Sequence, residues 1–236
     1  MTIRIFVIPR IMMALVCLTP LFTFAVALPD NLTVSYSVTH GKLKLGSIEK
    51  TLTRHGDSFK LVADTKANAM TQLFTGDLHE EATFKLEGET LYPLQYAVVR
   101  DGKKGYQRRV TFDWKQRLLN YDDGRVEDIP AGYVADSGSI FFALMLDAAR
   151  PTTGDTVAVV TGKGVNMYSV EIVGEETLKT PLGELNTLKL IQTRIDKPDR
   201  QLSVWLAVDK GNLPVKIEQQ KKGKISTLMI ESVSGL

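Results

Sequence analysis

Apolar and polar residues alternate with a period of two along most of the chain. Because successive side chains leave a β-strand on opposite faces, this alternation is typical of strands that bury one face and expose the other. In the strongest case, Tyr106, Val110, Phe112 and Trp114 all fall on one face. The clearest predicted strands lie at residues 33–38, 106–114, 168–172, 202–208 and 213–217.

Short sequences rich in glycine, asparagine and aspartate separate the predicted strands. These residues supply the positive φ that tight hairpins need. Strands joined by such short turns pair antiparallel, because a parallel crossover needs about a dozen residues or more. The turn sequences are His40-Gly41, His55-Gly56-Asp57, Glu87-Gly88-Glu89, Asp101-Gly102-Lys103, Asp122-Asp123-Gly124, Pro181-Leu182-Gly183, Asp209-Lys210-Gly211-Asn212 and Lys222-Gly223.

The expected fold is therefore mainly β. We expect a single antiparallel system, arranged as a curved or partly open β-barrel or a two-layer sheet, because curvature or closure limits the exposed strand edges. No Pro/Ser-rich linker divides the chain after residue 27, so a single domain is expected over residues 28–236.

One segment, at about residues 138–150, lacks the alternation and predicts a helix. Asp136 or Ser137 can cap its start, and Pro151 follows its end. Apolar residues surround nearly its whole circumference, which indicates burial against the sheet. Two interpretations remain open: the helix fills the open side of the curved sheet as part of the core, or it lines a space for an apolar ligand.

The first 27 residues have a different pattern. Arg4 and Arg10 precede an uncharged apolar stretch at residues 11–26, and small residues end the segment at Ala25-Val26-Ala27. This is the layout of a secretory signal peptide, and we expect cleavage near Ala27. The protein is therefore expected to be exported and, in a bacterium, periplasmic.

Two alternatives to a cleaved signal peptide are less favoured. An uncleaved anchor would need about 20 apolar residues, whereas this stretch is shorter and contains Pro20. A lipoprotein signal at Cys17 would need a small residue just before the cysteine, and Val16 stands there. We expect no transmembrane segment after cleavage.

Charge and composition exclude several classes of function. The sequence is 44% hydrophobic and 24% charged, which is typical of an ordered globular protein. Without residues 1–27 it has 27 basic and 27 acidic residues and no cysteine. A neutral chain has no overall field that would attract nucleic acid, so no nucleic-acid partner is expected. Disulfides and thiol chemistry are excluded in the processed chain.

The sequence gives little support for catalysis or metal binding. Ser137 and Ser139 do not lie in a nucleophile elbow, and helix capping explains them. Asp77, His79 and Glu81 would share one strand face, but this spacing separates their Cβ atoms by about 7 Å, which is wide for one ion. A solvated strand face is the preferred interpretation, and we expect no catalytic residue, metal or cofactor.

The strongest charge feature is a basic stretch, and one of its arginines falls on the apolar face. Arg108 shares the strand face of Tyr106, Phe112 and Trp114, so it needs an acidic partner or an anionic ligand. An internal ion pair is favoured over ligand binding. Gly162-Lys163-Gly164 lacks the spacing of a phosphate-binding loop. The basic residues are Arg100, Lys103, Lys104, Arg108, Arg109, Lys115 and Arg117.

Several turn-and-strand motifs occur in a characteristic order over roughly residues 30–234. They are Tyr36-Ser37-Val38 with Gly41 and Gly46, Leu91-Tyr92-Pro93 with Tyr96, residues 136–141, Lys179-Thr180-Pro181 with Gly183, Trp205-Leu206 with Asp209, and Leu213-Pro214-Val215-Lys216-Ile217. In this order they resemble a family of exported bacterial proteins known as a domain of unknown function. The resemblance implies a secreted or periplasmic β-rich protein and supplies no catalytic residues.

The hairpin from Trp205 to Pro214 has a second, looser resemblance. It is similar to a hairpin of periplasmic lipoprotein-carrier and outer-membrane lipoprotein-receptor proteins. Their fold is an unclosed antiparallel barrel, capped by helices, around a lipid-accepting cavity. By analogy alone, this resemblance implies a fold more than a function.

The sequence thus predicts an exported, non-catalytic protein that binds an apolar or amphipathic envelope molecule, such as a lipid, between sheet and helix. One alternative is a module that binds an envelope protein through an exposed face or strand edge. Another is a hydrolase of envelope polymers, with Asp77, His79 and Glu81 as its best site. The predicted cavity-lining residues are Arg108, Phe112, Trp114, Phe141, Met145 and Trp205.

Overall fold

The structure is a computed structural model that describes residues 28–69, 71–72, 76–102, 105–146 and 152–236. The predicted signal peptide, Lys103, Lys104 and residues 147–150 of the predicted helix lie outside the described residues. The strands are β1 (Asn31–His40), β2 (Leu43–His55), β3 (Ser58–Ala67), β4 (Leu78–Glu87), β5 (Thr90–Arg100), β6 (Tyr106–Asp113), β7 (Leu118–Tyr121), β8 (Val126–Asp128), β9 (Tyr133–Asp136), β10 (Thr156–Thr161), β11 (Gly164–Thr180), β12 (Gly183–Arg194), β13 (Arg200–Ala207), β14 (Leu213–Lys221) and β15 (Lys224–Ser234).

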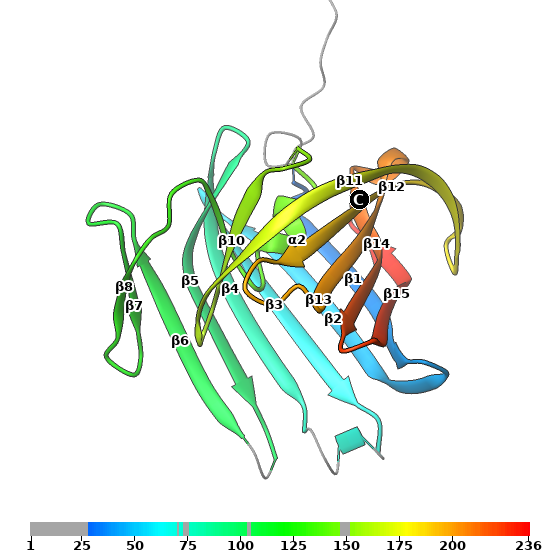
Figure 1. Cartoon of the computed structure of the whole chain (residues 1–236), viewed down its shortest axis with the longest axis horizontal. Coiled ribbons are helices and arrows are strands. Elements are labelled where there is room, and N and C mark those ends of the chain that lie inside the picture. The colour runs from blue at the N-terminus through cyan, green and yellow to red at the C-terminus, as the bar shows by residue number, and fades with distance from the viewer. Residues whose placement is uncertain (1–27, 70, 73–75, 103–104, 147–151) are drawn as a thin grey trace, which may run out of the picture.

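All fifteen strands belong to one sheet, in the order β8-β7-β6-β5-β4-β3-β2-β1-β15-β14-β13-β12-β11-β10-β9. The sheet consists of two meanders, which the pairing of β1 with β15 joins at its centre. It curves strongly, so that β10 to β14 pass in front of the strands from β2 to β5 (Figure 1). The hydrogen-bonded sheet is not closed, although its β9 end lies close to β5. The expected curved, partly open β-architecture is confirmed.

The alternation of the sequence explains how the strands form and which side they bury. In β3, Phe59, Leu61 and Ala63 are buried, while the residues between them are partly exposed. Gly41 and Gly56 adopt φ values of +57° and +60° in the turns that close the first two hairpins. These are conformations that glycine reaches at little cost, as the turn sequences predicted.

The predicted helix exists, but its described part is shorter than expected. Helix α2 covers Ile140–Ala143, and turns continue to Leu146. The turn just before it is held by Asp136, whose Oδ1 accepts hydrogen bonds from the backbone N–H groups of Gly138 (2.8 Å) and Ser139 (2.9 Å). The N-cap residue of α2 is Ser139, with no side-chain cap, so the predicted capping by Asp136 or Ser137 is wrong; Asp136 instead fixes the turn just before the helix.

The segment around α2 also produces an exception to the antiparallel pairing. It connects β9 to β10, and these two strands pair parallel. The connection is long enough for a parallel crossover, unlike the short turns elsewhere in the sheet. The expectation of purely antiparallel pairing is wrong at this one edge.

Helix α2 packs in the concave side of the sheet. Phe142 is fully buried, and the rings of Phe141 and Tyr36 of β1 meet edge to face at 5.7 Å. Both phenylalanines and Met145 belong to the main hydrophobic core. Among the described residues, no helix has the length and hydropathy that crossing a membrane requires.

Candidate ligand-binding cavities

A cavity of about 550 Å³, here called the inner cavity, lies between the two halves of the curved sheet and α2. Its volume is within the range of small-molecule sites, about 300–1,000 Å³. Apolar side chains form ten of its eighteen lining residues, and Phe141 and Leu144 contribute the helical side. The lining residues are Val38, Ile48, Lys50, Thr65, Leu78, Glu80, Arg100, Ser137, Ile140, Phe141, Leu144, Gln192, Leu202, Val204, Ile217, Gln219, Ser226 and Leu228.

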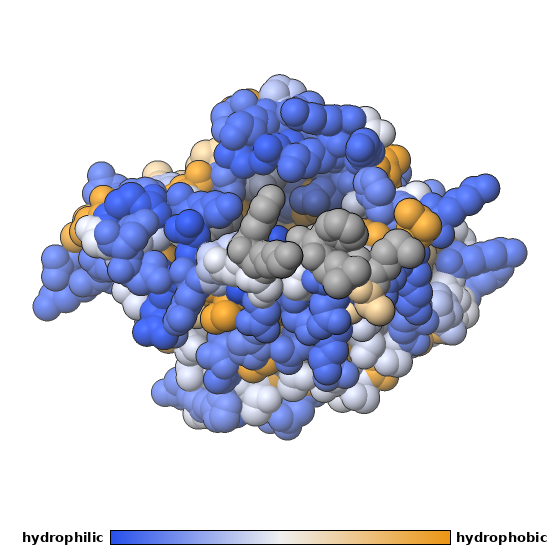
Figure 2. Space-filling model, turned by 90° about the horizontal axis from the view of Figure 1, so that it is seen from below, coloured by the Kyte–Doolittle hydropathy of each residue, from blue (hydrophilic) through white to orange (hydrophobic). Residues whose placement is uncertain are grey.

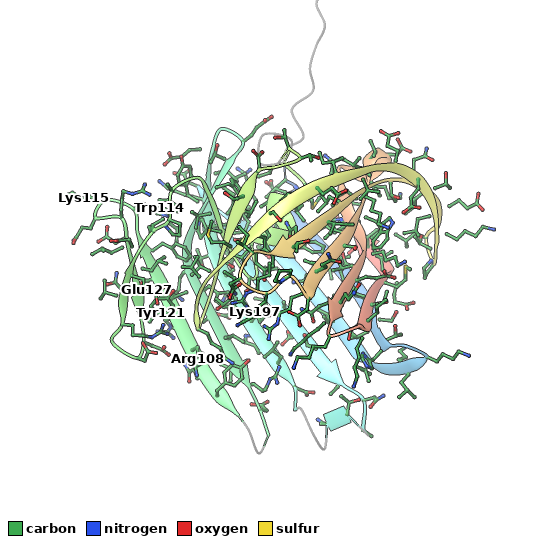
Figure 3. All side chains as sticks on the ribbon, viewed as in Figure 1. Arg108, Trp114, Lys115, Tyr121, Glu127 and Lys197 are labelled. Carbon is green, nitrogen blue, oxygen red and sulfur yellow. The ribbon has the colours of Figure 1, made fainter. Side chains whose placement is uncertain are left out.

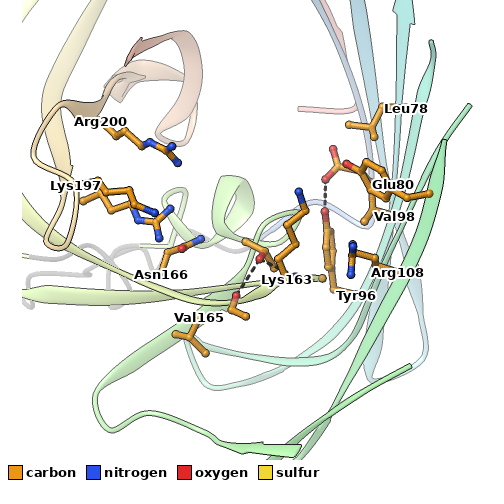
Figure 4. A pocket seen from close by; sticks show the side chains of 15 residues that line it. Leu78, Glu80, Tyr96, Val98, Arg108, Lys163, Val165, Asn166, Lys197 and Arg200 are labelled. Atoms are coloured by element: carbon orange, nitrogen blue, oxygen red, sulfur yellow. Dashed lines mark hydrogen bonds between the residues drawn. The ribbon is translucent and has the colours of Figure 1, made fainter. Parts of the chain in front are cut away.

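A second cavity of about 530 Å³, here called the outer cavity, adjoins the first, because Leu78 and Glu80 line both. Its walls come from β4, β5 and β6, from the β10–β11 turn and from the region of the β12–β13 turn (Figure 4). Arg108 and Lys197 lie toward the lower end of the molecule (Figure 3). The surface at that end is hollowed and mostly hydrophilic (Figure 2).

Basic side chains dominate the lining of the outer cavity. Five residues carry positive charge, and Glu80 is the one acidic residue among those that line it. The hydroxyl of Tyr96 donates a hydrogen bond to Oε1 of Glu80 at 2.5 Å (Figure 4). The five basic residues are Arg108, Lys163, Arg194, Lys197 and Arg200.

Three cations surround the ring of Tyr106, which lines this cavity; Arg108 and Lys163 also line it, whereas Arg100 lines the inner cavity. Arg100, Arg108 and Lys163 place their charged groups 5.5, 5.7 and 5.6 Å from the ring centroid. Cation–π attraction favours this arrangement. The Nε–H groups of Arg100 and Arg108 are nonetheless buried without a hydrogen-bond partner. Such groups are rare in folded proteins, because burial of an unpaired donor costs free energy.

The opposite side of the outer cavity is partly neutralised. Arg194 bonds to Asp196 through Nε at 2.5 Å, and this hydrogen bond holds the pKa of the Asp196 carboxyl below its usual range. Lys197 lies 3.7 Å from the same carboxylate. No ion pair within the described residues involves Arg200.

Polar groups are also buried at the inner cavity. Lys50 is only 8% exposed, and its Nζ lies 5.2 Å from the centre of the Phe141 ring. Burial lowers the pKa of this lysine, whereas the charges of Glu80 and Asp136 oppose that effect. Gln192 is 2% exposed, and its Nε2 has no hydrogen-bond partner among the described residues. These groups give a mainly apolar cavity a few polar positions.

Asp136 lies fully buried beside these groups. Its Oδ2 accepts a hydrogen bond from the Ser139 hydroxyl at 2.7 Å, in addition to the two backbone bonds that Oδ1 accepts. Burial raises the pKa of Asp136 to about 6, although the hydrogen bonds act in the opposite direction. The carboxyl therefore titrates near neutral pH while it holds the turn just before α2.

Two of the six residues predicted to line a cavity do line one of these two. Arg108 lies in the outer cavity and Phe141 in the inner cavity. The predicted ion pair of Arg108 is not found with any described carboxylate. Met145 instead packs in the core with 1% exposure.

The three remaining predicted residues lie elsewhere. The Trp114 indole donates a hydrogen bond to the carbonyl of Pro93 at 2.7 Å, and its ring stacks with Phe112 at 6.2 Å. Figure 3 shows Trp114 near one end of the β6–β7 hairpin, away from Arg108. Trp205 follows the cavity-lining Val204, so it points to the opposite face of β13, where Lys189 and Lys216 lie 4.7 and 4.3 Å from its ring.

Several cavity residues were not identified from the sequence. Lys50 carried a usable signal, because it occupies the same strand phase as Ile48 and Leu52 and thus falls on the buried face. The sequence around Lys163 and Arg200 gives no indication that either side chain faces a cavity. Only the curvature of the sheet brings their two turns to Arg108.

Of the residues considered for a metal or hydrolase site, His79 and Glu81 approach to 3.6 Å, but Asp77 bonds elsewhere. Asp77 accepts a hydrogen bond from the backbone N–H of Ala67 at 3.0 Å. His79 pairs with Asp64 at 2.7 Å on an exposed surface, and Glu81 pairs with Lys60 at 2.9 Å. In the described part of the chain, no three side chains of His, Cys, Asp or Glu are grouped to hold a metal ion.

Solved structures with similar folds are of bacterial proteins. A β-barrel-like protein of domain of unknown function DUF1849 from Brucella abortus has a TM-score of 0.55 and 7% identity, with 87% of this chain and 98% of that chain covered. At this identity the likeness shows the fold alone. It agrees with a β-barrel-like architecture.

Two further structures are more distant. A protein described as a lipoprotein from Parabacteroides distasonis has a TM-score of 0.38 and 8% identity, covering 87% of this chain and 95% of that chain. A domain described as an outer membrane lipoprotein-sorting protein from Vibrio parahaemolyticus has a TM-score of 0.26 and 11% identity, covering 87% and 85%. Neither TM-score is high enough to support an argument.

No curated protein matches the sequence. A family model does match, over residues 35–229, which include every strand from β2 to β14. The chain therefore belongs to the family described as "Protein of unknown function (DUF3108)".

Proposed function

We propose that this protein is a non-catalytic binding protein of the bacterial envelope, which holds an apolar or amphipathic molecule in the inner cavity. The observation that carries the proposal is the cavity of about 550 Å³ with mainly apolar walls. Burying an apolar group there removes it from water, and that transfer drives binding. The N-terminal pattern supports export, with cleavage near Ala27 and a periplasmic location.

The position of the cavity also supports binding rather than catalysis. Its walls come from both halves of the sheet and from α2, so a molecule held there would contact all three. Half of the lining residues are Ile, Leu or Val, and the charged groups of the cavity, Lys50, Glu80 and Arg100, are not arranged as a nucleophile beside a base. Lys50 and Gln192 at the walls supply the polar contacts that orient a ligand.

The first test is direct recovery of the bound molecule. Protein purified from bacterial envelopes without detergent is examined by native mass spectrometry and by organic extraction. We expect a mass above that of the polypeptide and an extractable molecule with an apolar part. Titration with the uncharged dye N-phenyl-1-naphthylamine is expected to give saturable fluorescence enhancement.

A cavity-filling variant locates the binding. Leu202 lines the inner cavity, and Leu202→Trp adds bulk there. We expect dye binding to weaken about tenfold or more, because the added ring occupies ligand volume. Val173→Trp, at a position that is 51% exposed on β11, is the matched control and is expected to bind as the wild type does. Absence of any bound molecule together with absence of saturable dye binding would refute the proposal.

A further inference from the structure

We propose that the outer cavity is the subsite for a phosphate group, so that the bound molecule is an amphiphile with a phosphate head. This inference rests on the proposed function, since the inner cavity would hold the apolar tail. The two cavities adjoin at Leu78 and Glu80, which line both. A single molecule can therefore occupy them together, with its tail and its head in different surroundings.

The strongest support is the cluster of cations around Tyr106. Arg100, Arg108 and Lys163 converge on one ring, although like charges repel each other. Two of their N–H groups, Nε of Arg100 and Nε of Arg108, are buried without an acceptor. An oxyanion between these side chains would accept those hydrogen bonds and neutralise the cluster. Arginine suits phosphate oxygens in particular, because its planar guanidinium presents several donors at once.

The local backbone keeps Arg108 in this place. A Cβ atom added at Gly162 would lie 2.6 Å from Cβ of Arg108. Glycine at position 162 therefore allows the β10–β11 turn to pack directly on Arg108. The same turn places Lys163 in the outer cavity. The Gly-Lys-Gly turn is not a phosphate-binding loop by spacing, but the fold places its lysine beside Arg108.

The opposite wall adds positive charge from a distant part of the sequence. Arg200 and Lys197 reach the cavity from one side, whereas Arg108 and Lys163 lie on the other (Figure 4). Asp196 compensates Arg194 and, at 3.7 Å, partly Lys197. A tetrahedral phosphate has oxygens that point in several directions, so it can contact both walls. A carboxylate, with two oxygens in one plane, can use fewer of these donors.

The experiment compares ligands that share a tail and differ in the head. Displacement of N-phenyl-1-naphthylamine by dodecyl phosphate and by dodecanol is measured for the wild type. We expect dodecyl phosphate to bind at least about tenfold more tightly, as one or two charge-assisted hydrogen bonds would give. Arg108→Gln is expected to remove most of this preference by weakening the binding of dodecyl phosphate.

A neighbouring arginine supplies the control. Arg109 is exposed on the other face of β6, so Arg109→Gln changes the net charge equally but should keep the preference for phosphate. Lys163→Gln repeats the test at an exposed turn residue, so the phosphate subsite can still be tested if Arg108→Gln fails to fold. Circular dichroism and thermal unfolding check that each variant is folded.

The other outcomes separate this inference from the proposed function. Equal binding of dodecyl phosphate and dodecanol, with the dye still bound, overturns the phosphate subsite but not the apolar site. Glycerol 3-phosphate binding as tightly as dodecyl phosphate would overturn the amphiphile and leave a site for soluble phosphate esters. Binding of neither the dye nor either dodecyl ligand contradicts the proposed function itself.

Discussion

Two prolines of the family-like motifs make equivalent contacts. The carbonyl of Pro93 accepts a hydrogen bond from the Trp114 indole, and the carbonyl of Pro214 accepts one from the Tyr36 hydroxyl, both at 2.7 Å. The pairing shifts register beside each proline, because Leu94 of β5 and Val215 of β14 are skipped in the register with β4 and β13. Proline has no N–H for the ladder, so a bulge next to it in the same strand is a natural accommodation. The aromatic donors then satisfy the carbonyls locally.

The buried carboxyl of Asp136 predicts a distinctive pH dependence of stability. Because its pKa rises to about 6 in the folded state, the folded protein holds a proton that the unfolded chain has already released. This contribution to the free energy of unfolding is complete below about pH 4 and is lost as the pH rises through 6. Relative to Asp136→Asn, the wild type should lose about 3 kcal/mol of stability across that window.

Urea unfolding of both proteins at several pH values measures this difference. Asp155→Asn is the matched control, because hydrogen bonds from Thr152 lower the pKa of Asp155 and so give the opposite sign. A constant difference between the wild type and Asp136→Asn from pH 4 to 7 would show that Asp136 titrates normally.

At the scale of elements, the alternation predicted strand positions and burial well, since both depend on neighbouring residues. The phase placed Arg108 on the inward side and Val110 in the core. It also puts Trp205 on the face opposite Val204, so the prediction of Trp205 as a cavity-lining residue went against the alternation. The alternation also gave no sign of the parallel pairing of β9 with β10, because a pattern along one strand does not show which strand it pairs with or in which direction.

Helix α2 is expected to contribute strongly to stability despite its four residues. Phe142 is fully buried in the core and meets the Phe141 ring at 5.0 Å. Phe142→Ala should lower the free energy of unfolding by about 3–5 kcal/mol, through lost burial and the cavity left behind. Chemical unfolding measures the change. Ile225→Ala, at a site that is 45% exposed, should cost little by comparison, and equal losses in both variants would contradict the buried role of α2.

At the scale of the whole molecule, the site is a product of curvature that no local pattern contains. Arg108 lies in β6, Lys163 in the β10–β11 turn and Arg200 at the start of β13. Arg108 stands out in its own stretch as an arginine on an apolar strand face, whereas Lys163 and Arg200 do not. Their meeting depends on the bend of the whole sheet, which brings β10 to β14 over the first meander (Figure 1).

The order of strands also predicts a gradient of amide protection. β1 lies at the centre of the sheet with partners on both sides, whereas β8 is a three-residue strand at one edge. Opening a central strand breaks more strand pairing and exposes more of the core. The free energy of opening β1 should therefore approach the free energy of global unfolding. Hydrogen–deuterium exchange should be slowest in β1 and fastest in β8. Equally fast exchange in both strands would contradict this sheet order.

The two ends of the sequence meet in the middle of the sheet, where Thr33 pairs with Ser234. During synthesis, β1 can pair with β2 at once, but its other edge stays open until the last strand has emerged. A chain that stops before Lys224 would leave two unfinished half-sheets, each with a long unpaired edge at β1 or β14. Such edges invite pairing with other chains. Truncated products should therefore aggregate, and the molecule can be completed only once its final residues are available.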